Sequence, residues 1–206
     1  MSLIIKEQTA SKISPISPGT YQAVCYGVVD VGDQYNETFK KASRKVIILW
    51  ELPGEFIDSD DGPQTRTISG TYTSSLSARA NLRGMLEAWR GAEFSDEELK
   101  GFNLKNIVGV NCHLTIVHKE KNSGGVFASI AGVSKLMKEL SPVLPTRTMI
   151  VYDMDVPSWE KDMQNLPEWI QKRIRDSETY KDRINGTNPA HSADAFTDVT
   201  MEDCPF

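Results

Sequence analysis

The spacing of the apolar residues changes twice along this chain, and that change limits the folds it can adopt. Between residues 19 and 73 the apolar residues form short β-branched runs and alternating segments typical of β-strands, residues 82 to 89 follow the helical period, and the alternating strand pattern returns from residue 108. The strand-like segments are rich in Val, Ile, Thr and Tyr, which favour sheets, and they lie at 19–31, 44–52, 65–73, 108–116 and 126–130. The sequence therefore predicts three strands, a helical insert and two further strands.

The helical insert has recognisable ends. Its apolar face falls at positions i, i+3, i+4 and i+7, occupied by Leu82, Met85, Leu86 and Trp89. Ser77 is placed to cap its start, and Gly91 stands where the left-handed residue that ends a helix is expected. The segment from Ser95 to Glu98 has the pattern of a capping box and predicts a second, short helix.

This order of elements is that of the OB-fold, a five-stranded barrel with a helix between its third and fourth strands. We expect a mainly β chain: an N-terminal lead-in without much structure (1–18), an OB-fold domain (19–140) and a C-terminal extension (141–184) ahead of a tail (185–206). Within the extension, Met149–Tyr152 predicts one more strand and Leu166–Ile174 a short helix whose apolar face is Leu166, Trp169, Ile170 and Ile174. We expect Trp50, in a segment that is apolar on both faces, to lie in the core.

Charge is unevenly distributed. Residues 1–140 carry 16 Lys/Arg and 16 Asp/Glu, whereas residues 141–206 carry 7 and 12, which accounts for the net charge of −5. Residues 185–206 contain no Lys or Arg and four acids, and their composition predicts disorder. A neutral body argues against tight duplex binding, which depends on neutralising phosphates.

Several classes of protein are excluded or disfavoured. No apolar run approaches twenty residues and the N-terminus has no long apolar segment, so we expect neither a membrane span nor a signal peptide. Three widely spaced cysteines predict neither a disulfide framework nor a zinc site, and the cytosol of a bacterial host is the expected compartment. Enzyme motifs such as a phosphate-binding Gly-Lys-Ser/Thr loop are absent, so we expect no catalytic residues and no cofactor.

Two clusters resemble metal ligands but are better explained as structural. Cys112 and His113 are adjacent on a strand, so their side chains point to opposite faces and cannot easily share an ion with His118. Asp153 and Asp155 are close enough to hold a divalent ion, as in a small nuclease, yet such a pair is more often a solvated strand end. We therefore expect no metal.

Cationic and aromatic side chains gather at two loops. OB-folds hold single-stranded nucleic acid in a groove that combines cations with aromatic rings on which bases stack. The expected contacts in the first inter-strand loop, and at its join to the second strand, are Tyr35, Phe39, Lys40, Lys41, Arg44 and Lys45. The last hairpin and its polar face contribute His113, Lys119, Lys121 and Phe127. The alternatives are a solvated loop with Phe39 packed on the barrel, and Phe127 packed under a C-terminal segment.

The chain ends in acids interleaved with apolar residues and a terminal Pro-Phe, a pattern typical of a short linear motif. Its expected partner-binding residues are Asp198, Glu202, Asp203, Pro205 and Phe206. The carboxylates steer such a tail to basic pockets, into which a terminal aromatic ring can insert.

This tail resembles the acidic tip of bacterial single-stranded-DNA-binding proteins. The body is similar to a group of phage-encoded proteins in the segments Trp50–Pro53, Ser69–Thr73, Trp89–Gly91 and Leu166–Ile170. The resemblance implies a phage single-stranded-DNA-binding protein acting in replication, recombination or repair, whose tip recruits replication or repair proteins and competes with DNA for the groove. The alternative is an OB-fold adaptor that binds protein and not DNA. The sequence leaves open whether the chain forms a homo-oligomer.

Overall fold

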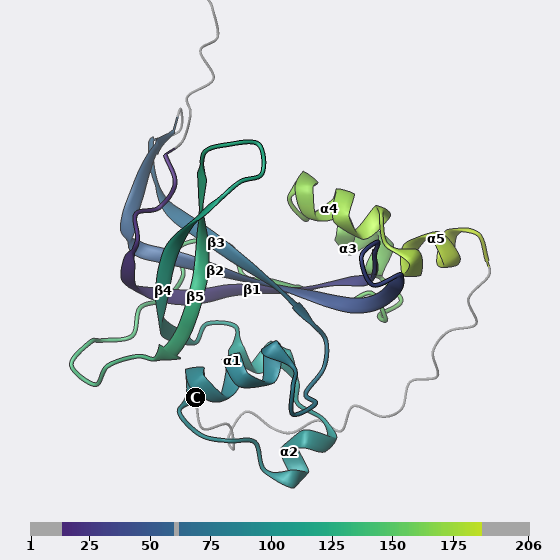
Figure 1. Cartoon of the computed structure of the whole chain (residues 1–206), viewed down its shortest axis with the longest axis horizontal. Helices are drawn as coiled ribbons and strands as arrows, with labels where there is room; N and C mark the ends of the chain where they lie inside the picture. Colours follow the sequence, from purple (N-terminus) through teal and green to yellow (C-terminus); the bar gives the residue numbers. More distant parts are fainter. Residues whose placement is uncertain (1–13, 60–61, 187–206) are drawn as a thin grey trace, which may run out of the picture.

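The computed structural model describes residues 14–59 and 62–186, and those residues form one mainly antiparallel sheet of six strands (Figure 1). The strands are β1 (Gly19–Asn36), β2 (Lys41–Ser59), β3 (Gly62–Thr73), β4 (Asn111–Glu120), β5 (Val126–Lys135) and β6 (Ile150–Tyr152). The hydrogen-bonded path runs β3-β2-β1-β4-β5, so β3 and β5 are its two ends. The prediction of a mainly β chain with helices between the third and fourth strands is confirmed.

The hairpin of β1 and β2 is longer than the sequence predicted. The expected polar loop at 32–43 is reduced to a turn, because Asn36 pairs with Lys41. The Asn36 side chain accepts a hydrogen bond from the Phe39 amide, and Lys40 has a positive φ of 47°. The loop prediction was wrong there because the residues that flank the turn are polar yet still pair, on a part of the hairpin that projects beyond β4.

β6 confirms the strand predicted at 149–152 and shows its partner. It lies parallel to β1 and pairs with residues 27–29, continuing the edge that β4 leaves at Val24. The close approach requires Gly27, since a Cβ there would lie 3.0 Å from Leu49 Cδ1 and 3.1 Å from Ile150 Cβ.

The insert between β3 and β4 consists of α1 (Asn81–Arg90), α2 (Asp96–Lys100) and the 3₁₀ turn η1 (Leu104–Ile107). Gly91 ends α1 with a φ of 73°, and Ser95 and Glu98 form the predicted capping box. Ser77 does not cap α1, because the helix begins four residues later, after Ala80. Leu82, Leu86 and Trp89 are buried as the spacing predicted.

The sheet is covered on both faces, which gives the molecule two apolar cores. The first includes Trp50, as expected, together with α1 and the buried side of β4. The second joins the opposite face of β1 and β2 to the C-terminal extension, with helices α3 (Trp159–Met163), α4 (Glu168–Arg175) and α5 (Glu178–Ile184). Ile170 and Ile174 of α4 are fully buried there, but Trp169 is 50% exposed, so its assignment to the apolar face was wrong.

Part of the predicted lead-in belongs to the folded body. Residues 14–17 form no regular element, yet Ile16 is buried in the first core and its carbonyl oxygen lies 2.8 Å from His118 Nε2. The predictions for residues 1–13, and those for the tail from residue 187 onward, lie outside the described residues. Within the described ranges, no helix is long and apolar enough to cross a membrane.

Candidate nucleic-acid interface

The tip of the β1–β2 hairpin presents aromatic rings and cations to solvent. Phe39 is 79% exposed and Tyr35 is 47% exposed, so both rings are accessible to solvent. Lys40 lies in this turn, Lys41 directly follows it, and both are exposed. This arrangement removes the alternative in which Phe39 packs on the body, and it leaves two rings and two ammonium groups available for contact.

The β4–β5 hairpin carries a second, smaller group. Lys119 and Phe127 are directly opposite each other in the antiparallel pair and therefore lie on the same face. Phe127 is 39% exposed, so its side chain is partly accessible to solvent. Lys121 stands at the turn, where its amide donates to the Gly125 carbonyl oxygen.

The two hairpins end at different places on the molecule. In Figure 1 the tip of β4–β5 projects upward, whereas the far end of β1–β2 extends beside the C-terminal helices. The structure thus divides the predicted contact residues into two groups and does not bring them into one shared groove. A ligand that touches both groups has to span the surface between them.

Arg44 forms ion pairs within the folded protein. It forms an ion pair with Asp30 on β1, and its Nη2 lies 2.6 Å from Asp155, which follows β6. Burial disfavours the charged guanidinium, but the hydrogen bonds and charges of the two carboxylates raise the Arg44 pKa above its usual value. Arg44 therefore connects β2 to β1 and to the turn after β6.

His113 and Lys45 are less exposed than the residues at the two hairpin tips. His113 is only 6% exposed, so its ring is not on the accessible surface. Its cross-strand neighbour Gln22 donates to the Ser141 carbonyl oxygen, which places the chain after β5 across this face. Lys45 is half-buried, donates to Thr73 Oγ1 at 2.7 Å and lines a pocket beside β3.

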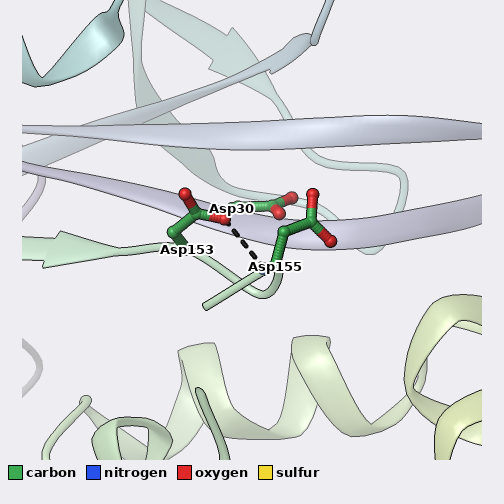
Figure 2. Close-up of side chains that lie close together, drawn as sticks. All are labelled: Asp30, Asp153 and Asp155. Atoms are coloured by element: carbon green, nitrogen blue, oxygen red, sulfur yellow. Dashed lines mark hydrogen bonds between the residues drawn. The ribbon is translucent and has the colours of Figure 1, made fainter. Parts of the chain in front are cut away.

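Three carboxylates gather between β1 and the turn after β6 (Figure 2). One oxygen from each of Asp30, Asp153 and Asp155 lies within 4.8 Å of the others. Arg44 pairs with two of them and Arg183 lies 2.6 Å from Asp155. The Asp155 amide donates to Asp153 at 2.9 Å, the bond drawn in Figure 2. These partners account for the cluster as an ion-pair network, and we assign no metal to it.

Sequence reasoning missed the pocket at the end of β3. It has a volume of about 360 Å³ and is lined by Lys45, Thr71, Tyr72, Thr73, Ser75, Ser77, Arg79, Ala80 and Asn81. A serine-rich segment and a cation directly before the helix were the available signals, but Ser77 was interpreted only as a cap. A second pocket, of about 540 Å³, lies between α1 and the chain after β5 and is lined by residues that include Trp89, Leu136, Met137 and Leu140.

No family model, no curated protein and no solved structure matches the chain.

Proposed function

We propose that this chain is a non-enzymatic protein that binds single-stranded DNA with little sequence preference. The observation that carries the proposal is the pairing of exposed rings with cations on the hairpins, above all Phe39 beside Lys40 and Lys41. A ring that is 79% exposed contributes little to folding. It is suited to stack on a base, because every base has a π-face, while the lysines contact phosphates.

The topology supports an OB-fold as the framework. In an OB barrel the first strand pairs with the second and the fourth, the second with the third and the fourth with the fifth. The path β3-β2-β1-β4-β5 has these neighbours, and the insert stands between the third and fourth strands. Contacts between β3 and β5 bring the two ends of the path together. We propose that the sheet is an OB barrel open along this seam, with β6 as an addition.

The contact set is smaller than the sequence suggested. We retain Tyr35, Phe39, Lys40 and Lys41 on the first hairpin, and Lys119, Lys121 and Phe127 on the second. Arg44 and His113 are removed from it, because one is held in ion pairs and the other is buried. The proposal also includes a role in phage replication, recombination or repair, and the recruitment of partner proteins by the tail that ends at Phe206. Only the resemblance supports these two parts.

A titration of labelled oligo-dT followed by fluorescence anisotropy tests the proposal. We expect the full chain to bind oligo-dT, to bind duplex of the same length more weakly, and to lose affinity as salt rises. No binding of oligo-dT at low salt refutes the proposed function. Equal affinity for duplex refutes the role given to the exposed rings, since paired bases cannot stack on them.

A protein-binding adaptor is the alternative, and one observation favours it. The pocket of about 540 Å³ is lined mainly by apolar side chains, among them Leu136, Met137 and Leu140. Met137 is 56% exposed. Apolar surface of this kind is common where proteins bind each other. A chain that binds no oligo-dT, whose Met137→Glu variant loses a partner captured by the wild type, would be an adaptor.

A further inference from the structure

The pocket at the end of β3 combines two cations with several hydroxyl groups. Lys45 enters from β2, Thr71 and Thr73 line it from β3, and Arg79 stands on the segment that leads into α1. Its volume of about 360 Å³ lies within the range of small-molecule sites. Among the residues that the structure describes, no Asp or Glu lines it, so the charge that faces the pocket is positive.

The two cations are not engaged by acids elsewhere. Among residues 14–59 and 62–186, neither Lys45 nor Arg79 forms an ion pair. Lys45 donates one hydrogen bond, to Thr73 Oγ1 at 2.7 Å, which directs its ammonium group toward the pocket wall. An ammonium group has three donor hydrogens, so Lys45 retains donors for a ligand. Arg44, one residue earlier, is by contrast held by two carboxylates.

The hydroxyl groups are arranged as donors. Thr73 Oγ1 accepts from Lys45, and Ser77 Oγ lies 3.2 Å from Ser75 Oγ, which donates to it. A hydroxyl whose oxygen already accepts a bond still has its own hydrogen to donate. Thr73 and Ser77 can therefore donate to an acceptor placed between Lys45 and Arg79. The start of α1 adjoins the pocket, and Ala80 provides no side-chain cap there. The first backbone N–H groups of the helix are therefore further hydrogen-bond donors.

We infer that this pocket binds a phosphate group of a nucleic acid, with Lys45 and Arg79 as its charged contacts. A phosphate matches the site because it offers several acceptor oxygens and a negative charge to a wall made of donors and cations. The inference rests on the proposed function and extends it from the hairpin tip to a specific pocket. Lys41 and Lys45 are four residues apart on β2, about 13 Å at roughly 3.3 Å per residue. One bound strand can therefore contact both.

The first experiment uses inorganic phosphate as the probe and the full chain labelled with ¹⁵N. Amide shifts on titration should be confined to the neighbourhood of Ser75, Ser77 and Arg79, and should disappear in the double variant Lys45→Gln/Arg79→Gln. Lys105→Gln, an exposed cation on η1 that does not line the pocket, is the matched control and should leave the shifts unchanged. Shifts that persist in the double variant, or that spread over the whole surface, overturn the assignment.

The second experiment identifies the source of the phosphate. Oligo-dT with hydroxyl ends carries only internal phosphates, whereas the same oligomer with a 5′-phosphate adds a terminal one. If the pocket takes an internal phosphate, the double variant should bind both oligomers about tenfold more weakly, with a salt slope smaller by about 0.7. If it takes a terminal phosphate, only the phosphorylated oligomer should be affected. Unchanged affinity for both overturns the inference.

The two proposals fail in different ways. Wild-type binding of oligo-dT that is unaffected by the double variant leaves the proposed function intact and refutes the pocket. Absence of oligo-dT binding refutes the proposed function, while the inorganic phosphate titration still decides whether the pocket holds an anion. Thermal unfolding of the double variant shows whether it is folded, and the single variant Arg79→Gln, which alters an exposed residue, repeats the test if it is not.

Discussion

The guanidinium group of Arg44 lies 2.6 Å from a carboxylate oxygen of Asp155, 111 residues later in the chain, and pairs at the same time with Asp30. Asp30 also accepts hydrogen bonds from the amides of Gly32 and Met154. Arg44 therefore joins β1, β2 and the turn after β6 at one point. The sequence predicted Arg44 as a DNA contact. In the folded protein, Arg44 connects the sheet to the C-terminal extension.

Arg44→Gln should lower the free energy of unfolding by about 2 to 4 kcal/mol, because it leaves the buried Asp30 carboxylate without its cation. Urea unfolding followed by tryptophan fluorescence measures the change. Lys41→Gln removes a neighbouring charge that is exposed and unpaired with acids in the described residues, and it should alter stability by less than about 0.5 kcal/mol. If the Arg44→Gln variant is stable but loses oligo-dT binding, Arg44 is a DNA contact and not only a structural residue.

Phe39→Ala should weaken oligo-dT binding by about 1 to 3 kcal/mol, the range for loss of one stacked base. The fold should be unaffected, because most of the ring is accessible to solvent. Phe56→Ala is the matched control: Phe56 is also an exposed phenylalanine, 60% accessible, on the β2–β3 hairpin. Anisotropy titrations on both variants give the comparison, and equal losses would show that Phe39 has no special role.

Glu98→Gln should remove a pH-dependent part of the stability. Hydrogen bonds from the Arg90 guanidinium lower the Glu98 pKa from 4.5 to about 2. Because the folded pKa is the lower one, the stabilisation is complete above about pH 4.5 and is lost as the pH falls toward 2. At pH 7 the variant should be less stable by about 1.5 to 3 kcal/mol.

Urea unfolding of the wild type and the Glu98→Gln variant across this pH range checks the sign. The difference in the free energy of unfolding between the two proteins should become smaller as the pH falls. Glu97→Gln serves as the control, because Glu97 is an exposed neighbour whose ion pair with Lys100 lies on the surface. A difference that stays constant from pH 7 to pH 3 would contradict the assignment.

Cys25 and Cys112 should be unreactive in the folded protein. Burial raises the pKa of Cys25 to about 12 and also raises the pKa of Cys112, so neither thiol ionises near neutral pH. In a Cys204→Ser background, a thiol reagent at pH 8 should label these two residues only as fast as the protein unfolds. Labelling within seconds, without denaturant, would show that the first core opens locally.

The sequence predicted the first core better than the second. Alternation at Cys112, Leu114 and Ile116 and the helical spacing around Leu86 depend on local order, so they can be read directly from the chain. The run Val46–Trp50, apolar on both faces, was the sign that β2 is covered on two sides. The helices α3, α4 and α5 cover the second face of β2. The helix α3 has five residues and α5 has seven, which is too few to show a clear helical period in the sequence.

The candidate site was predicted in part for the same reason. Exposed rings and cations at the tip of a hairpin, such as Phe39 and Lys40, follow from local sequence alone. The ion pair of Arg44 depends on Asp155, and the burial of His113 depends on where the chain after β5 runs, so neither is visible from neighbouring residues. The pocket of Lys45 and Arg79 needs β2, β3 and the start of α1 to be placed together.

The second core has a consequence for synthesis of the protein on the ribosome. Ile47 and Leu49 are made early, but their buried neighbours Ile170 and Ile174 emerge more than a hundred residues later. At a translation rate of about 5 to 20 residues per second, this face of the β1–β2 hairpin remains exposed to solvent for roughly ten seconds. During this interval the nascent chain carries an uncovered apolar surface, so chaperone binding should be strongest before α4 leaves the exit tunnel.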